Sequence, residues 1–267
     1  MRIDLHVHGA LSKQTGFDLE LMREKMAVAR ERGLDAILLT EHFNISGFKT
    51  IYNLLLKEFP FNGNYFEIEK IKVFPGIEVN IAEGPHLVAG GTLENVLKLN
   101  ERLSDYRQKG QYCSADIYFD KQAGMELLNI FAHPTRANNL LKQLHEKYHH
   151  NFDAFEVNAK DIYLYGREVR EQMAVAADKV ELPVVAGSDA HHFFQLGTVF
   201  NDFHQPFESV TEIKAAIANR YYDLHIASDA EKNVAAAIEA KQVLKAEFST
   251  PSLAEVTGRE ANNVAKN

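Results

Sequence analysis

Two short motifs, far apart in the chain, combine histidines with an acid. The motif DLHVH near the start contains His6 and His8, and the motif SDAH in the last third contains Asp189 and His191. In an extended strand alternate side chains project to the same face, so each pair is expected to point at one spot. Imidazoles together with a carboxylate form a ligand set suited to zinc, manganese or iron. The two motifs therefore predict a metal centre if the fold brings them together.

Apolar segments typical of strands alternate with amphipathic segments typical of helices. Strands separated by helices imply parallel pairing through right-handed crossovers, and about seven such units favour a barrel over an open sheet. The sequence therefore predicts an α/β protein. The expected strands are 3–8, 35–40, 72–79, 86–89, 128–133, 154–158, 183–188 and 198–203; the expected helices are 19–32, 48–59, 93–105, 122–127, 138–148, 166–179, 209–219 and 229–246.

Acids and imidazoles recur where these expected strands end. In (β/α) barrels the chemistry collects at the carboxyl ends of the strands, so these side chains are expected to meet. His86 is the exception, because it lies where its strand begins. Asp4 and Glu41 are neighbours of histidines in this set and are expected to support ligands or to line the barrel. The side chains at strand ends are His6, His8, Glu41, His42, Glu78, His133, Glu156, Asp189 and His191.

Composition limits the class of protein and its partners. The chain has 267 residues, of which 46% are hydrophobic and 25% charged, as is usual for a soluble globular protein. The single Cys113 excludes an internal disulfide, and residues 1–30 lack the pattern of a signal peptide. Without a long apolar run, a membrane span is not expected, and we expect a cytoplasmic protein. The net charge of −8 disfavours a broad surface for duplex nucleic acid, while short oligonucleotides stay compatible with it, since bound cations reverse the local field.

Six motifs in a fixed order, each beside an expected strand, resemble the polymerase and histidinol phosphatase (PHP) family of metal-dependent phosphoesterases. The resemblance runs from Ile3 to about Phe203. It implies a distorted (β/α)7 barrel, which we assign to residues 1–227. It also implies two or three divalent ions, variously zinc, manganese or iron. The Ala-rich segment and the polar stretch after it predict a C-terminal helix and a polar tail over 228–267. The motifs are DLHVH (4–8), TEH (40–42), PGIEV (75–79), HLV (86–88), AHPTR (132–136) and GSDAH (187–191).

The resemblance also implies which residues hold each ion. Two departures bear on a third ion: Lys13 lies where many members have an acid, and Glu41 precedes His42 where aspartate is more usual. A lysine there would repel a third ion, or would replace its charge and hold a substrate phosphate. The implied groups are His6, His8, Glu78 and Asp189 for the first ion; Glu78, His86 and His133 for the second; and His42 with His191 for the third.

These residue types suit hydrolysis of a phosphoester. Bound metals lower the pKa of water, so ions bridged by Glu78 would hold a hydroxide aimed at phosphorus. Arg136, three residues after His133, is a candidate for a bidentate phosphate contact. The leaving oxygen needs a proton or a cation, and Asp189, His191 or a third ion would supply it; the sequence does not choose among them.

The leading hypothesis is a metal-dependent phosphoesterase acting on a small phosphorylated metabolite or a nucleotide. One alternative keeps the ions and hydrolyses C–N or lactone bonds, as amidohydrolases do, and Arg136 argues for the anionic substrate. Another alternative is a non-catalytic, metal-stabilised PHP module. The loop-rich segments 44–70 and 104–122 are expected to determine selectivity, and the oligomeric state is left open.

Overall fold

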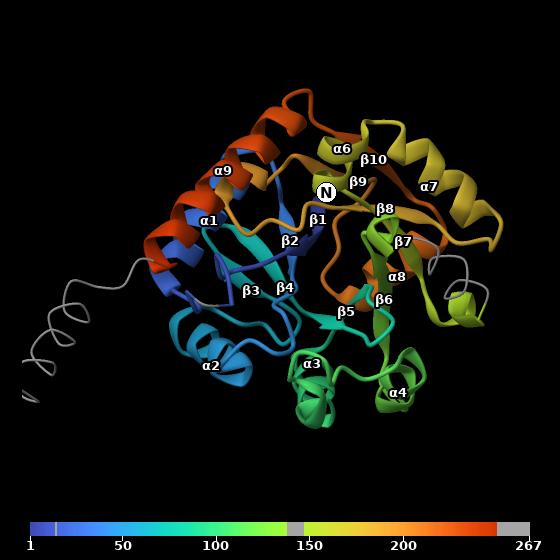
Figure 1. Cartoon of the computed structure of the whole chain (residues 1–267), viewed down its shortest axis with the longest axis horizontal. Helices are drawn as coiled ribbons and strands as arrows, with labels where there is room; N and C mark the ends of the chain where they lie inside the picture. The colour runs from blue at the N-terminus through green and yellow to red at the C-terminus, as the bar shows by residue number, and fades with distance from the viewer. Residues whose placement is uncertain (14, 138–146, 250–267) are drawn as a thin grey trace, which may run out of the picture.

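The computed structural model describes residues 1–13, 15–137 and 147–249. Strands and helices alternate along most of the chain (Figure 1). The strands are β1 (Arg2–Val7), β2 (Ala36–Leu39), β3 (Phe66–Ile68), β4 (Ile71–Asn80), β5 (His86–Gly91), β6 (Leu127–Ala132), β7 (Ala154–Asn158), β8 (Val184–Gly187), β9 (Val199–Phe203) and β10 (Tyr222–Ile226). The helices are α1 (Leu19–Glu31), α2 (Phe48–Glu58), α3 (Leu93–Arg102), α4 (Ala115–Lys121), α6 (Ala159–Tyr165), α7 (Val169–Asp178), α8 (Val210–Ala218) and α9 (Ala230–Ser249).

The strands β1, β2, β4, β5, β6, β7 and β8 follow one another around a ring, with α2, α3, α4 and α7 on its outside (Figure 1). The ring closes between β1 and the segment after β8. There the amide of Asp189 donates to the carbonyl of His6, and the amide of His8 to the carbonyl of Ala190, both at 2.9 Å. Nearer the other end of the barrel, the buried Asn201 amide joins Ile3 to Ala186 across the same gap. The expected distorted barrel is confirmed.

The strand directions differ from the expected parallel arrangement. β5 runs antiparallel to both β4 and β6, and β9 runs antiparallel to β1 and β10. The prediction of parallel pairing throughout was therefore wrong. A parallel return needs a crossover of about a dozen residues, whereas only the turn around Gly84 separates β4 from β5. The reversal has a consequence for the site, because it places His86, the first residue of β5, at the end where β4 and β6 finish.

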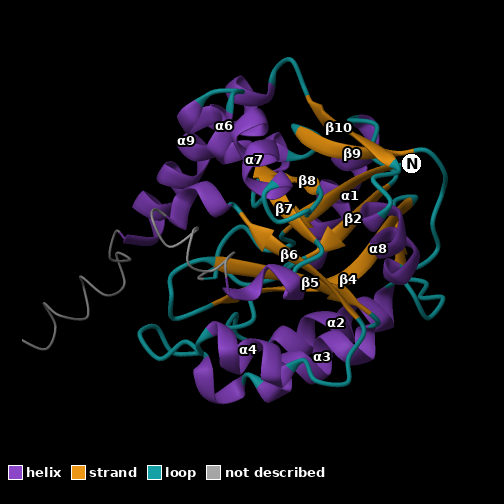
Figure 2. Ribbon diagram, turned by 90° about the vertical axis from the view of Figure 1, so that its right-hand side faces the viewer, coloured by secondary structure: helices purple, strands orange, loops and turns teal. Residues whose placement is uncertain are grey.

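Two apolar clusters hold the barrel together. The larger one packs the outer faces of the strands against the helices, and the smaller fills the barrel interior. Helix α8 contributes to the interior cluster and closes the end at which β1 begins, while α6 and α9 lie on the opposite side (Figure 2). The interior is therefore apolar at one end and free to hold polar groups at the other. The interior cluster includes Ile3, Leu5, Leu38, Phe74, Val88, Ile130, Val185, Val210 and Ile217.

Several expected boundaries shift or fail. The helix expected at 122–127 was wrong: the helix is α4, which begins after its cap Ser114, and the chain turns at Gly124 with φ 77°. The short elements β3, α6 and β10 were not expected. Most of the helix expected at 138–148 lies outside the described residues.

The helix expected at 229–246 is confirmed as α9. Its inner face carries the buried residues Ala230, Val234 and Ala237, and it packs against α6. The division of the chain at residue 227 stays a prediction. Among the described residues, no helix is both long and apolar enough to cross a membrane.

Candidate metal centre

A change of register in β1 aims its histidines into the barrel. Ile3 and Leu5 belong to the interior cluster, whereas Val7 belongs to the outer one. Simple alternation from Ile3 and Leu5 would turn Val7 inward and His6 and His8 outward. The structure has Val7 in the outer cluster instead. Between Asp4 and Val7 the pairing with β2 slips by one residue, the signature of a β-bulge, and such bulges re-aim side chains. As a result His6 and His8 both face the site.

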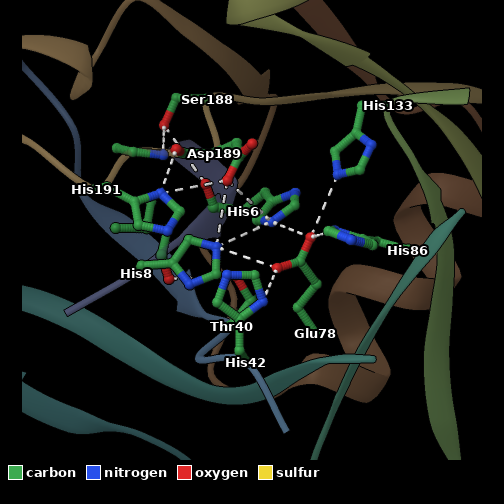
Figure 3. Close-up of polar contacts among 12 residues, drawn as sticks. His6, His8, Thr40, His42, Glu78, His86, His133, Ser188, Asp189 and His191 are labelled. Atoms are coloured by element: carbon green, nitrogen blue, oxygen red, sulfur yellow. Dashed lines mark hydrogen bonds and ion pairs between the residues drawn. The ribbon is translucent and has the colours of Figure 1, made fainter. Parts of the chain in front are cut away.

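Glu78, near the end of β4, lies at the centre of the site and is fully buried. Five imidazoles surround its carboxylate (Figure 3). Because they come from several different strands and loops, the barrel and not any local segment creates the cluster. The nitrogens near Oε1 are His6 Nε2 at 3.3 Å, His86 Nδ1 at 2.6 Å and His133 Nε2 at 3.3 Å; those near Oε2 are His8 Nε2 at 3.4 Å and His42 Nδ1 at 2.7 Å.

The motif after β8 completes the cluster. Asp189 Oδ1 lies 3.3 Å from His8 Nε2 and 3.7 Å from His6 Nε2. The His191 ring stacks on that of His8, with centroids 4.0 Å apart. Asp189 and His133 both have left-handed backbones, with φ of 55° and 32°. Such conformations cost on the order of 1–3 kcal/mol outside glycine and gather at functional sites.

Three groups of side chains bring their ligand atoms within 4.8 Å of one another. The first group is the one that the resemblance implies. The second contains His42 in place of the His133 that the resemblance implies, although His133 also contacts Glu78. The third adds His8 to the implied pair. The groups are His6, His8, Glu78 and Asp189; His42, Glu78 and His86; and His8, His42 and His191.

The donor atoms fit divalent cations. Within the described residues, His42 Nδ1 and Glu78 Oε2 are buried and 2.7 Å apart, but neither atom makes a hydrogen bond. A buried polar atom left without a partner costs about 1–3 kcal/mol. Imidazole nitrogens and a carboxylate oxygen converging in this way satisfy the coordination preferences of zinc, manganese or iron. The residues therefore fit the ions that the sequence predicts.

The charges of the cluster are strongly coupled. Burial alone would raise the pKa of Glu78, but the imidazoles of His86, His42 and His6 hold it well below its usual value. Burial opposes protonation of His6, yet Glu156 and Glu78 raise its pKa well above the ordinary value. The carboxylates of Glu78 and Glu156 thus attract positive charge to this end of the barrel. A metal ion would compete with protons for the same imidazole nitrogens.

Glu156, in β7, orients the ligands from behind. Its Oε1 lies 2.7 Å from His6 Nδ1, and its Oε2 accepts the backbone amide of His133 at 2.7 Å. Fixing the second ring nitrogen of a metal-binding histidine sets its tautomer and direction. Only glycine fits at 187, because a Cβ there would collide with Glu156 and with His6. The sequence left Glu156 undecided between support and site, and the geometry favours support.

Arg136 and Lys13, the two predicted phosphate contacts, differ in their surroundings. The Arg136 guanidinium donates to Asp161 Oδ1 at 2.6 Å, to Asp189 Oδ2 at 3.1 Å and to Asn158 Oδ1 at 2.5 Å. Lys13 is exposed, and its Nζ lies 3.5 Å from Asn80 Oδ1. Arg136 is therefore held against Asp189, whereas Lys13 extends from a loop toward Asn80.

Sequence reasoning missed several side chains that support the ligands. Asn80 contacts His86 Nε2, and Asn158 and Asp161 bind Arg136. Asn80 and Asn158 each end a strand that also carries a glutamate of the site, so their positions in the sequence offered a signal. The buried Lys25 in α1 offered none, because its contacts are all distant in sequence.

The chain is similar to known proteins in part of its sequence and in its fold. Residues 169–221, which include Asp189 and His191, match the PHP-associated family model. The fold is similar to that of PsfC from Pseudomonas syringae PB-5123, with a TM-score of 0.72, 22% identity, and coverage of 91% of this chain and 98% of PsfC. The resemblance to the PHP family is confirmed.

Two further structures share the PHP-like fold. One is the lesion-specific endonuclease Q from Pyrococcus furiosus, with a TM-score of 0.61 and 21% identity over 82% of this chain. The other is endonuclease Q in complex with a 27-mer duplex that carries an abasic lesion, with a TM-score of 0.58 and 19% identity over 82% of this chain. In both cases the match spans only 56% of the other chain. No curated protein matches the sequence.

Proposed function

We propose that this protein is a metal-dependent phosphoesterase. The observation that carries the proposal is the position of Glu78, whose two oxygens face two different groups of imidazoles. One carboxylate between two ligand groups suits neighbouring divalent ions. When bound, such ions neutralise phosphate oxygens and lower the pKa of water. We assign His6, His8, Glu78 and Asp189 to one ion, with His42, His86, His133 and His191 completing the others.

The pKa directions favour ligand roles for the motif after β8. Burial would raise the pKa of Asp189, but contacts with His8 and His6 hold it well below its usual value. Burial, together with the neighbouring His8, lowers the pKa of His191 well below the ordinary value. Both groups are therefore deprotonated near neutral pH. They suit binding of a cation better than donation of a proton to the leaving oxygen.

Arg136 and Lys13 supply the positive charge for a substrate phosphate. Arg136 donates three hydrogen bonds to acceptors among the described residues, and a guanidinium has five N–H groups, so two are available for substrate within this part of the chain. Its pairing with Asp161 and Asp189 fixes the plane of the guanidinium. Among the described residues Lys13 Nζ contacts Asn80 Oδ1 at 3.5 Å, and its exposed side chain can follow a phosphate of variable position. Arg136 thus orients the substrate, and Lys13 adds charge.

A small phosphorylated metabolite or a nucleotide is the substrate class that we propose. Endonuclease Q has been captured with a lesion-bearing duplex, which raises the question of DNA for this chain. The net charge of −8 argues against a long duplex, because such binding depends on clustered Lys and Arg. Short oligonucleotides, whose phosphates would all lie near the cations, remain within the proposal.

A substrate screen tests the proposal. Purified protein loaded with manganese or zinc is incubated with phosphomonoesters, phosphodiesters, short oligonucleotides, amides and lactones. We expect turnover of phosphoesters that disappears on chelation and returns when metal is restored. Hydrolysis of amides or lactones alone would replace the proposal with the amidohydrolase alternative. If fully loaded protein cleaves nothing, and chelation unfolds it, the ions are structural and the proposal fails.

A further inference from the structure

A buried lysine lies behind the metal centre. Lys25 comes from the middle of α1, and its side chain is 1% exposed. Its Nζ donates to three backbone carbonyls: His8 at 2.9 Å, Gly9 at 2.9 Å and His191 at 2.6 Å. An ammonium has three N–H donors, so each one has an acceptor. This side chain is therefore fully committed to holding backbone and has no donor left for substrate.

The three carbonyls lie on the two sides of the seam where the barrel closes. His8 and Gly9 follow β1, and His191 follows β8. In the described part of these segments, two backbone hydrogen bonds join them, at His6 and at His8. Lys25 adds its three bonds just beyond them, where the strands have ended and no further ladder bonds form. It thus fixes the spacing between the two segments at the level of the ligands.

Burial of the Lys25 ammonium is unfavourable unless its hydrogen bonds stabilise the fold. Burial lowers the pKa of Lys25 to about 7, and the nearby carboxylate of Glu41 opposes that shift. Glu41 itself is occupied, since its Oε1 accepts the amide of Ala10 at 2.7 Å. A nonpolar side chain of equal length would avoid the burial of charge but would leave three carbonyls without a donor.

The two residues that Lys25 ties together belong to one ligand group. The rings of His8 and His191 stack with centroids 4.0 Å apart, and that of His42 lies 4.6 Å from His8 and 5.7 Å from His191 (Figure 3). His191 belongs to this group alone, whereas His8 and His42 also serve the others. The position of His191 relative to His8 therefore decides whether this group can hold an ion.

We propose that Lys25 is a positioning residue for the ion bound by His8, His42 and His191. By clamping the backbone of His8 to that of His191, it keeps the two imidazoles at a separation that one cation can bridge. The inference rests on the proposed metal-dependent function, but it concerns one ion only. The group of His6, His8, Glu78 and Asp189 shares His8 with this one, but its His6 and Asp189 have supports of their own that do not involve Lys25.

The experiment counts the ions bound per chain and their affinities, by calorimetric titration and elemental analysis of metal-loaded protein. The variants are Lys25→Met, which keeps length and removes the donors, and Lys25→Arg, whose planar donors cannot converge on three carbonyls. His191→Ala defines the loss of the third group. Met26→Ala, a buried core change in the same helix, controls for destabilisation alone.

We expect Lys25→Met to weaken one class of ion about tenfold to a hundredfold, the class that His191→Ala removes, and to weaken the other ions much less, because most of their ligands are not held by Lys25. Lys25→Arg should give the same selective weakening in smaller measure, which tests the idea even if Lys25→Met does not fold. Combining Lys25→Met with His191→Ala should produce no further loss of ions. Met26→Ala should lower the melting temperature without changing metal binding.

The proposal is overturned if the Lys25 variants keep every ion at wild-type affinity, or if they lose all ions equally. It is also overturned if His191→Ala binds as many ions as wild type, because the group then holds none. Failure of the phosphoesterase proposal looks different: the ion counts follow the expected pattern, but the loaded wild-type protein hydrolyses no phosphoester.

Discussion

The two ends of the barrel differ in how their charged side chains are paired. At the end where β4 begins, Lys72 donates to Glu208 Oε1 at 2.5 Å and to the carbonyl of Phe207 at 3.0 Å, and Tyr65 donates to Glu208 Oε2 at 2.8 Å. These charges lie at the surface over an apolar plug formed by α8. At the other end, Glu78 is fully buried with an oxygen that lacks a hydrogen-bond partner. One end is locally satisfied, whereas the other gathers buried polar groups that suit a ligand.

The difference teaches where to look for function in this molecule. Local consistency of packing, charge and backbone is the rule for a stable fold, and departures gather at functional sites. Here the left-handed His133 and Asp189, the bulge in β1 and the buried Glu78 Oε2, which makes no hydrogen bond, all lie at the same end. Substitutions at that end should alter metal binding and turnover, whereas substitutions at the plugged end should alter stability slightly and turnover not at all.

The largest effect is expected for Glu78→Ala. Removing the carboxylate that faces two ligand groups should abolish stable metal binding and lower turnover by about three orders of magnitude. Asp4→Ala, a buried acid lower in β1, serves as the comparison and should cost far less turnover. Elemental analysis and steady-state kinetics measure both. Equal and mild effects of the two substitutions would refute the central role of Glu78.

Arg136→Gln should come next, with kcat/KM for a phosphoester reduced about tenfold to a hundredfold, as expected when a charge-assisted hydrogen bond is lost. If Arg136 contacts substrate, KM should rise while metal content stays constant. A fall in metal affinity instead would show that its contact with Asp189, at 3.1 Å, is its main role. Kinetics and metal titration on the same preparation separate the two.

Glu156→Gln tests the support behind the ligands. The amide keeps the shape but removes the charge that lies 2.7 Å from His6 Nδ1. Metal affinity should fall about tenfold to a hundredfold, the usual range for partners of metal-binding histidines. Calorimetric titration measures it, and unchanged affinity would contradict the orienting role.

Asp4 predicts a pH effect on stability. Burial raises its pKa from 3.8 to about 7, against hydrogen bonds from Ser188 and His6. The folded state therefore binds this proton more tightly than the unfolded state, so the stability it contributes is complete below pH 3.8 and is lost as pH rises through 7. Asp4→Asn cannot titrate, so its melting temperature relative to wild type should rise between pH 4 and 8. A difference that does not change with pH would contradict this.

The smallest effect is expected at the plugged end. Lys72→Met breaks the ion pair with Glu208, whose side chain is 59% exposed, and should change the free energy of unfolding by less than about 1 kcal/mol. Turnover and metal content should match wild type. A marked loss of activity in this variant would contradict the assignment of function to the opposite end of the barrel.

The sequence predicted most of the elements and the ligand types, because periodicity and motif order are local properties that survive without coordinates. Strand direction around β5 was not predictable from alternation of helices and strands, so His86 appeared misplaced until the antiparallel pairing put it beside Ala132. The bulge in β1 was equally hidden, because a change of register depends on the neighbouring strand. The roles assigned to individual site residues stay predictions.

By itself the sequence determined a barrel-forming alternation of strands and helices, and a set of histidines and carboxylates suited to divalent ions. Only the tertiary structure decided which of them share a spot, that Glu156 backs His6, and that Lys25 clamps the seam. The reason is physical: residue type fixes what a side chain can bind, but the distance between atoms on separate strands is set by the packing of the whole barrel.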